Sequence, residues 1–234
     1  MAQKTYQIDD IGKVTFYKHR ASKTIRIKLN GGTVKVTLPS WLPYKTAVEF
    51  VKKRKQWIAN NQAQRLPFID GSIIGNNYRL RLISSNSSNF SIQEEGSIIT
   101  IAVPLDQTSE SEAGQNRIEK YITNILKRDA ENILIPMARQ LANENNFNLS
   151  SLEIKKLKSR WGSCNNKKDV VLNLYLIQLP DTHIKYVIFH ELAHTVHLNH
   201  SKEFWSLVEK FVPDYMTIKK EIKSHSPDIV VSRP

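Results

Sequence analysis

Hydrophobic and polar residues alternate along the first part of the chain. In IRIKL (25–29) and VKVTL (34–38) every second residue is apolar, as expected for strands with one buried face. Asn30, Gly31 and Gly32 between them tolerate the positive φ angles of a tight turn. Together with the preceding VTFY, these stretches predict a small antiparallel sheet within residues 13–38.

The spacing of apolar residues changes to a helical one in two later segments. A basic amphipathic helix is predicted over 45–64, where Val48, Val51, Trp57 and Ile58 are the apolar positions. A longer helix is predicted over 116–143, and Pro136 should kink or split it because proline lacks a backbone donor. Strands are expected between these helices, at 73–83 and 98–103, with the ISSNSSN stretch (83–89) as a hairpin loop.

The last third of the chain predicts strands followed by helices. LEIKKL (152–157) and VVLNLYL (170–176) have strand composition. Asp181 is the expected N-cap of a helix that continues through the histidine-rich segment. Another helix is expected over 202–212, because its apolar residues lie on one face.

These elements predict an α+β protein with a basic, β-rich N-terminal half. The polar, acidic stretch 106–115 suggests a connection between two halves. We therefore expect an N-terminal region with one amphipathic helix over 1–112, a second domain over 113–225 and a flexible tail over 226–234.

The net charge of +12 is concentrated near the N-terminus. Residues 1–68 contain fourteen Lys or Arg against three acidic residues, which gives +11. This region is expected either to be a solvated surface or to contact nucleic acid or another anionic partner. Cys164 is the single cysteine, which excludes an internal disulfide and a four-cysteine zinc ribbon. With no apolar leader and no membrane span in the sequence, a cytoplasmic location is expected.

The segment HELAHTVHLNH (190–200) has the spacing of a metal site. His190 and His194 are four residues apart, so they project from one face of a helix and can bind the same zinc ion. Glu191 has the position of a general base. The apolar surroundings, VIFHELAH, make unpaired surface histidines an unfavourable explanation.

A catalytic zinc usually has a third protein ligand, and two histidines are candidates. His197 lies near the same helical face, but its backbone would be about 10 Å from that of His190 along a straight helix. His200 can reach the metal if the helix ends at Asn199 and Ser201 caps the next helix. We therefore predict His190, His194 and His200 as ligands and place His197 outside the metal's ligand set.

Five ordered blocks of sequence resemble the YgjP-like metallopeptidase family, which is related to SprT and Spartan-type zinc proteases. The blocks are SRWGSC (159–164), VLNLYLIQLP (171–180), YVIFHELAH (186–194), NHSKEFW (199–205) and VPDYMTIKK (212–220). The resemblance implies a zincin-like core with an HExxH active-site helix beneath a small sheet. It also implies the ligands and the base assigned above. A metzincin would have Gly at the position of His197, so the turn before His200 should differ from theirs.

The function expected from these residues is zinc-dependent hydrolysis of amide bonds in a protein or peptide. Arg160, Trp161 and Asn173 are candidate substrate-binding residues, although packing roles explain Arg160 and Trp161 equally well. One alternative is a metal-dependent nucleoside triphosphate hydrolase, with phosphates held by Arg160 and the basic region. Another is a nucleic-acid-binding protein whose zinc is structural. No membrane partner is expected.

Overall fold

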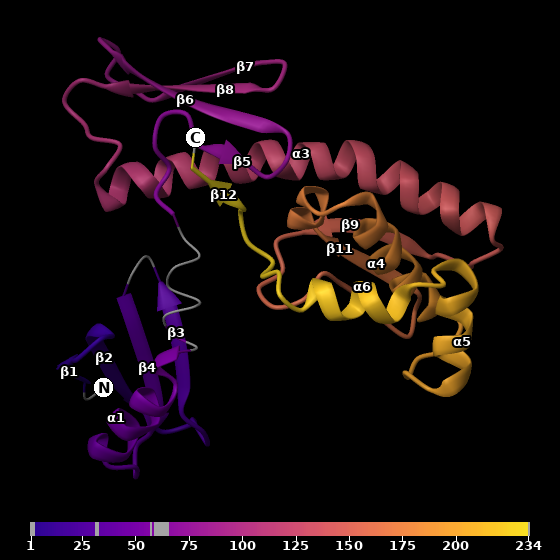
Figure 1. The fold of residues 1–234 in the computed structure, drawn as a ribbon, viewed down its shortest axis with the longest axis horizontal. Coiled ribbons are helices and arrows are strands. Elements are labelled where there is room, and N and C mark those ends of the chain that lie inside the picture. The colour runs from indigo at the N-terminus through magenta and orange to yellow at the C-terminus, as the bar shows by residue number, and fades with distance from the viewer. Residues whose placement is uncertain (1–2, 31–32, 57, 59–65, 234) are drawn as a thin grey trace. The chain divides into compact units, whose positions relative to one another are not determined.

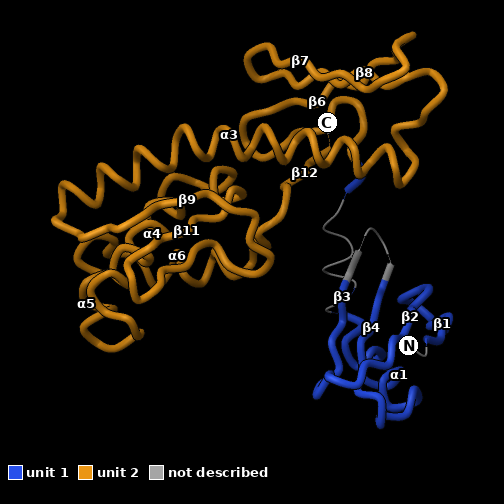
Figure 2. The backbone as a smooth tube through the Cα atoms, turned by 180° about the vertical axis from the view of Figure 1, so that it is seen from behind, with its two compact units in different colours: residues 1–67 blue, residues 68–234 orange. Residues whose placement is uncertain are grey.

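The structure is a computed structural model that describes residues 3–30, 33–56, 58 and 66–233. The chain forms two compact units, residues 1–67 and 68–234 (Figure 2). Both contain helices and strands, so the α+β class is confirmed. The boundary expected between residues 112 and 113 falls inside unit 2, because the strands before it and the helix after it share one hydrophobic core.

Unit 1 contains a four-stranded sheet and helix α1 (Tyr44–Lys53). Its strands have the order β1-β2-β4-β3 and are β1 (Gln3–Ile8), β2 (Gly12–His19), β3 (Arg26–Asn30) and β4 (Thr33–Pro39). β3 and β4 pair antiparallel, as the alternating pattern predicts. β2 is parallel to β4, because the chain passes to the edge strand β3 before it returns to the middle of the sheet. The sheet is therefore mixed, which corrects the antiparallel prediction.

One face of this sheet packs against α1. Phe16 and Val36 from the strands and Ala47 and Val51 from the helix are all fully buried in one cluster. Of the helix predicted over 45–64, the structure shows α1; Trp57 and residues 59–64 lie outside the described residues.

Unit 2 begins with a five-stranded sheet of order β12-β5-β6-β8-β7. The strands are β5 (Ile73–Ile74), β6 (Tyr78–Ser85), β7 (Ser91–Glu95), β8 (Ile98–Pro104) and β12 (Val231–Ser232). β6 pairs with β8 and not with β7, so the polar stretch after β6 crosses over β8 instead of closing a hairpin. The tail expected to be flexible is instead held by the β12–β5 ladder and by burial of Ile229.

A long helix, α3 (Glu112–Glu144), runs past both sheets of unit 2 (Figure 1). Ser111 caps it by accepting a hydrogen bond from the Gly114 backbone at 3.0 Å. The helix continues through Pro136, so the predicted split does not occur. Burial of Leu134 and Ala138 on either side of the proline offsets the lost backbone hydrogen bond.

The second sheet of unit 2 has three strands and carries the histidine helix. Its order is β10-β11-β9, with β9 (Ser151–Lys155) parallel to β11 (Asp169–Asn173) and β10 (Gly162–Cys164) antiparallel to it. A 3-10 helix, η1 (Leu174–Gln178), is followed by α4 (Asp181–Ala193), α5 (Lys202–Phe211) and α6 (Tyr215–Ile222). Pro180, not Asp181, is the N-cap of α4. Among the described residues, we find no helix with the length and hydropathy needed to cross a bilayer.

Candidate metal centre

Helix α4 places His190 and His194 next to each other. The helix is apolar on almost every side, and it contacts β10 and β11 as well as the helices α3, α5 and α6. Such a helix is stable only when it is surrounded by protein. His190 on the helix and His194 at its C-cap are half-buried, with ring centroids 5.0 Å apart. The four-residue spacing therefore has the effect that the sequence predicts.

His200 returns to these two histidines from the turn that follows α4. Its Nε2 atom lies 3.1 Å from Nε2 of His190. α4 ends at Ala193, earlier than the predicted end at Asn199, and a non-helical turn then carries the chain to α5. Ser201 caps α5, as predicted, by accepting a hydrogen bond from the Phe204 backbone at 3.4 Å.

The three histidines form a cluster whose chemistry fits a divalent metal ion. One ring nitrogen from each of His190, His194 and His200 lies within 4.8 Å of the others. Burial and the neighbouring His194, His200 and Lys219 lower the pKa of His190 to about 3. An imidazole that stays neutral keeps its lone pair available for a metal. Two ring nitrogens 3.1 Å apart also make an arrangement that a shared cation would satisfy.

His197 contacts this cluster through its backbone. The Nδ1 atom of His194 donates a hydrogen bond to the carbonyl of His197 at 3.1 Å. That bond fixes the ring of His194 and leaves its Nε2 available as a ligand. The side chain of His197 is not part of the three-histidine group.

Glu191 is buried against strand β10, and its exposed fraction is 5%. A Cβ atom on Gly162 would lie 2.7 Å from both Cγ and Oε1 of Glu191, so a side chain at position 162 would displace the carboxyl group. Burial raises the pKa of Glu191 to about 8, and the positive charge of Arg160 opposes this shift. The sequence motif names the glutamate, but only the packing of α4 on β10 shows why glycine stands at position 162.

The remaining predicted residues occupy different environments. Arg160 is exposed, and it is close enough to Glu191 for its positive charge to lower the pKa of that carboxyl group. Trp161 is half-buried and packs against the core of unit 2. Asn173 is fully buried, and its amide nitrogen donates to the carbonyls of Leu157 and Arg160 at 2.8 Å each. Asn173 therefore holds the loop that carries Arg160 and has no surface for a substrate.

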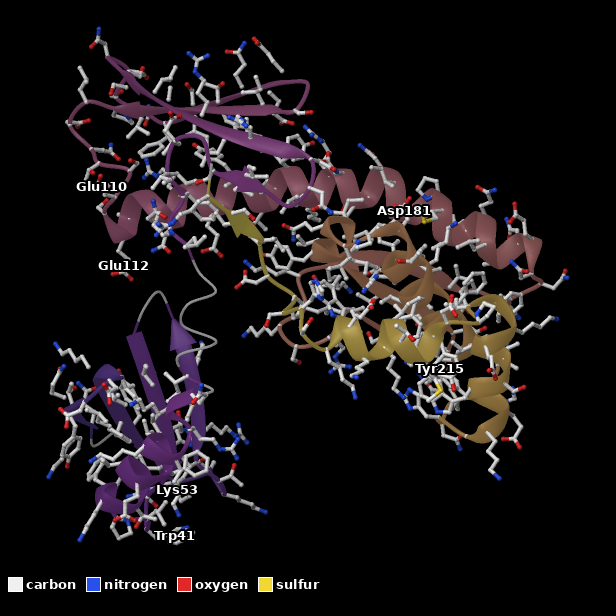
Figure 3. All side chains as sticks on the ribbon, viewed as in Figure 1. Trp41, Lys53, Glu110, Glu112, Asp181 and Tyr215 are labelled. Atoms are coloured by element: carbon white, nitrogen blue, oxygen red, sulfur yellow. The ribbon has the colours of Figure 1, made fainter. Side chains whose placement is uncertain are left out.

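A stack of aromatic residues borders the cluster and was not predicted from the sequence. Trp205 of α5 stacks on His200, with centroids 5.4 Å apart, and on Tyr215, at 5.2 Å. Lys219 of α6 places its Nζ 3.7 Å from the centroid of the Trp205 ring. Figure 3 shows Tyr215 at the start of α6. The tryptophan in NHSKEFW is the sequence signal for an aromatic residue near His200. The sequence does not show that α6 packs beside it.

Phe204 closes the inner side of the cluster. It is fully buried, and its ring centroid lies between 4.5 and 5.0 Å from those of His190, His194 and His200. The apolar pattern of α5 predicts a core residue here, and this one packs directly on the histidine rings. Of the three histidines it contacts, His200 is the exposed one.

Comparisons with known proteins give two matches. A family model described as "YgjP-like, metallopeptidase domain" matches residues 23–225. The crystal structure of the metallopeptidase zymogen of Pyrococcus abyssi abylysin matches with 22% identity and a TM-score of 0.36, covering 39% of this chain and 93% of that one. A search of curated proteins finds no match. The family model spans His190, Glu191, His194 and His200.

Proposed function

Because this chain belongs to the YgjP-like metallopeptidase family, we propose that it is a zinc-dependent peptidase that hydrolyses amide bonds at the three-histidine cluster. The single observation that carries the proposal is the convergence of His190, His194 and His200 beside the buried Glu191. The family supplies the reaction class, a metal-dependent peptidase. The geometry of the cluster supports the choice of His190, His194 and His200 as its metal-binding residues.

His190, His194 and His200 would hold the metal. Zinc accepts neutral imidazole ligands readily, and a set of three leaves one coordination position open, as catalytic sites require. His200 is exposed while the other two are half-buried, which leaves the cluster accessible from solvent on one side. Bound zinc would supply a Lewis acid that polarises the scissile carbonyl and makes water a stronger nucleophile.

Glu191 would act as the general base. Its carboxylate would accept the proton of the attacking water and pass it to the leaving amine. Its raised pKa reflects burial, and the positive charge of Arg160 only partly opposes the shift. A cation held by the histidines would favour the charged carboxylate, which is the form that the base requires. Gly162 leaves the space in which the carboxyl group lies.

Arg160 is the better candidate of the predicted substrate-binding residues. Its guanidinium is exposed beside the buried base and can contact a carboxylate or a carbonyl oxygen of a peptide. Trp161, which is half-buried, would border the position that the peptide occupies beside Arg160. Asn173 would act as a positioning residue for the loop of Arg160.

The two alternative functions have less support from the site. Phosphate hydrolysis usually uses metals bound by carboxylates, and the metal-binding group found among the described residues contains histidines only. A structural zinc is usually enclosed by four protein ligands, whereas this group has three and includes an exposed one.

The test is the variant Glu191→Gln. Removing the base should lower peptidase turnover about 100-fold or more, while the zinc content measured by mass spectrometry stays at the wild-type level. Glu203→Gln is the matched control, because Glu203 is exposed on α5 and should leave turnover unchanged. Full turnover in Glu191→Gln would contradict the assigned base. If the wild-type protein retains zinc but cleaves no peptide in a broad peptide library, the proposed peptidase activity is contradicted.

A further inference from the structure

The sheet of unit 1 has one face that α1 leaves uncovered. Strand register places its residues in rows across the strands. Thr5, Thr15, Lys35 and Lys28 form one row, from β1 through β2 and β4 to β3. A hydrogen bond between the Thr5 and Thr15 hydroxyls, at 3.2 Å, shows that they share a face. Phe16 and Val36 alternate with these residues and pack into the core beneath α1, so the rows lie on the opposite face.

This uncovered face is positively charged. Lys13, Arg26, Lys28 and Lys35 are all exposed on it, and no Asp or Glu occurs in any of the four strands. Within the described residues, none of these four cations has a carboxylate partner, whereas Lys55 of the same unit pairs with Asp10 at 2.6 Å. We call these four residues, together with Tyr17, the basic face.

The arrangement of the cations opposes the stability of the sheet. Lys28 and Lys35 are direct cross-strand partners, and like charges in this position repel each other. Lysines on edge strands prevent aggregation, which would explain Lys28 on β3. It does not explain Lys35 on β4 or Lys13 on β2, because both strands lie inside the sheet. A polyanion on this face would remove the repulsion.

Tyr17 adds an aromatic ring to the same face. It belongs to a second row, Gln3, Tyr17, Thr37 and Arg26, and it is half-buried. An aromatic side chain among cations and hydroxyl or amide groups is the composition that binds bases and phosphates of a single strand. Lys4 and Lys18, by contrast, contact the Tyr44 ring at 5.4 and 5.1 Å.

We propose that the basic face binds single-stranded nucleic acid, with the backbone phosphates on Lys13, Lys28, Lys35 and Arg26 and a base stacked on Tyr17. A single strand fits the flat face of a sheet, whereas the grooves of a duplex accept a helix or a two-stranded ribbon. The excess positive charge that would attract a polyanion belongs to this unit, because residues 69–234 contain twenty basic and nineteen acidic side chains. The proposal is independent of the peptidase.

The first test measures binding of the full chain to a fluorescein-labelled oligo(dT) of about 20 nucleotides by anisotropy. The logarithm of the affinity should fall linearly with that of the salt concentration, with a slope of about −0.7 for each phosphate contacted. The triple variant K13Q/K28Q/K35Q should bind at least about tenfold more weakly and reduce the magnitude of the slope by about 2.

The matched control is K45Q/K52Q/K53Q, which removes the same charge from α1, where Lys53 is visible in Figure 3. This control should change the affinity less than about threefold. Equal weakening of both triple variants would overturn the proposal, because it would show that net charge and not this face binds. Circular dichroism of both variants checks that the fold is retained.

The second test separates stacking from charge. Tyr17→Leu should lower the affinity for oligo(dT) about fivefold or more and leave the salt slope unchanged, while Tyr17→Phe should bind like the wild type. Vesicles of phosphatidylserine and phosphatidylcholine test the other polyanion. Absence of oligo(dT) binding at low salt, or binding to vesicles that exceeds it, would overturn the proposal.

Discussion

Glu191 can lie against strand β10 because residue 162 has no side chain. The carboxyl group fills the space that a Cβ atom would occupy, with Cγ and Oε1 both 2.7 Å from that position. A catalytic carboxylate is effective when its surroundings hold it in one position before the reaction begins. At this site, a glycine on one element defines the position of a glutamate on another.

We predict that Gly162→Ala lowers peptidase turnover about tenfold or more and destabilises the fold by about 1–3 kcal/mol, because the added methyl group overlaps Glu191. Zinc content should stay at the wild-type level, since the histidines are untouched. Turnover and chemical denaturation measure the two effects. Ser163→Ala on the same strand is the control, and similar losses in both variants would mean that β10 is merely sensitive to change.

The sequence predicts the chemistry of single residues better than their roles. His190, Glu191 and His194 follow from helical spacing, which is local. The buried hydrogen bonds of Asn173 depend on the loop at Leu157 and Arg160, and nothing local indicates them. The stack of Lys219 and Tyr215 on Trp205 depends on how two helices pack.

At the scale of elements, the end of α4 decides whether a third histidine reaches the cluster. The helix stops at Ala193, and Thr195 closes the turn with a hydrogen bond from its hydroxyl to the Leu192 carbonyl at 2.7 Å. The sequence predicts that His200 lies beside the other two histidines, and it does. It predicts the helix end at Asn199, however, whereas the helix ends at Ala193. Thr195 and the His194–His197 bond end the helix earlier through interactions that have no strong sequence signal.

We predict that His200→Ala and His197→Ala have different effects on metal binding. Loss of the His200 ring should weaken zinc retention about 100-fold or more, as expected for the removal of one of three ligands. His197→Ala should change it less than about threefold, because the carbonyl that binds His194 remains. Competition with a chelating dye measures both affinities. The reverse order would show that His197 is the third ligand.

At the scale of the whole molecule, charged and polar contacts join the five-stranded sheet to α3. The Tyr78 hydroxyl donates to Asp129 at 2.5 Å, and Arg128 binds both carboxylate oxygens of Glu94 at 2.9 and 2.7 Å. These contacts connect β6 and β7 to the helix that also packs against β9. The sequence predicted a domain boundary in this region, because a polar stretch before a helix resembles a linker and tertiary contacts across it are not visible in the pattern.

We predict that Tyr78→Phe changes the pH dependence of stability. Burial, followed by the hydrogen bond to Asp129, raises the pKa of Tyr78 to about 12 from 10.0. The folded state therefore holds this proton more tightly, so the stabilisation is complete below pH 10 and is lost as pH rises towards 12. Urea unfolding between about pH 9 and 11.5 should show a smaller loss for the variant than for the wild type. Parallel curves would contradict the assigned interaction.

The pairing of β12 with β5 affects the order in which unit 2 is assembled during synthesis. The backbone of Gly75 donates to Val230 at 2.8 Å, and Gln178, which precedes α4, accepts from Val230 at 2.9 Å. The ribosome must therefore pass residue 232 before either the five-stranded sheet or the contact of Val230 with Gln178 is complete. A nascent chain that already contains all three histidines lacks these contacts. A metal ion bound before that point would therefore bind to an incompletely folded unit 2.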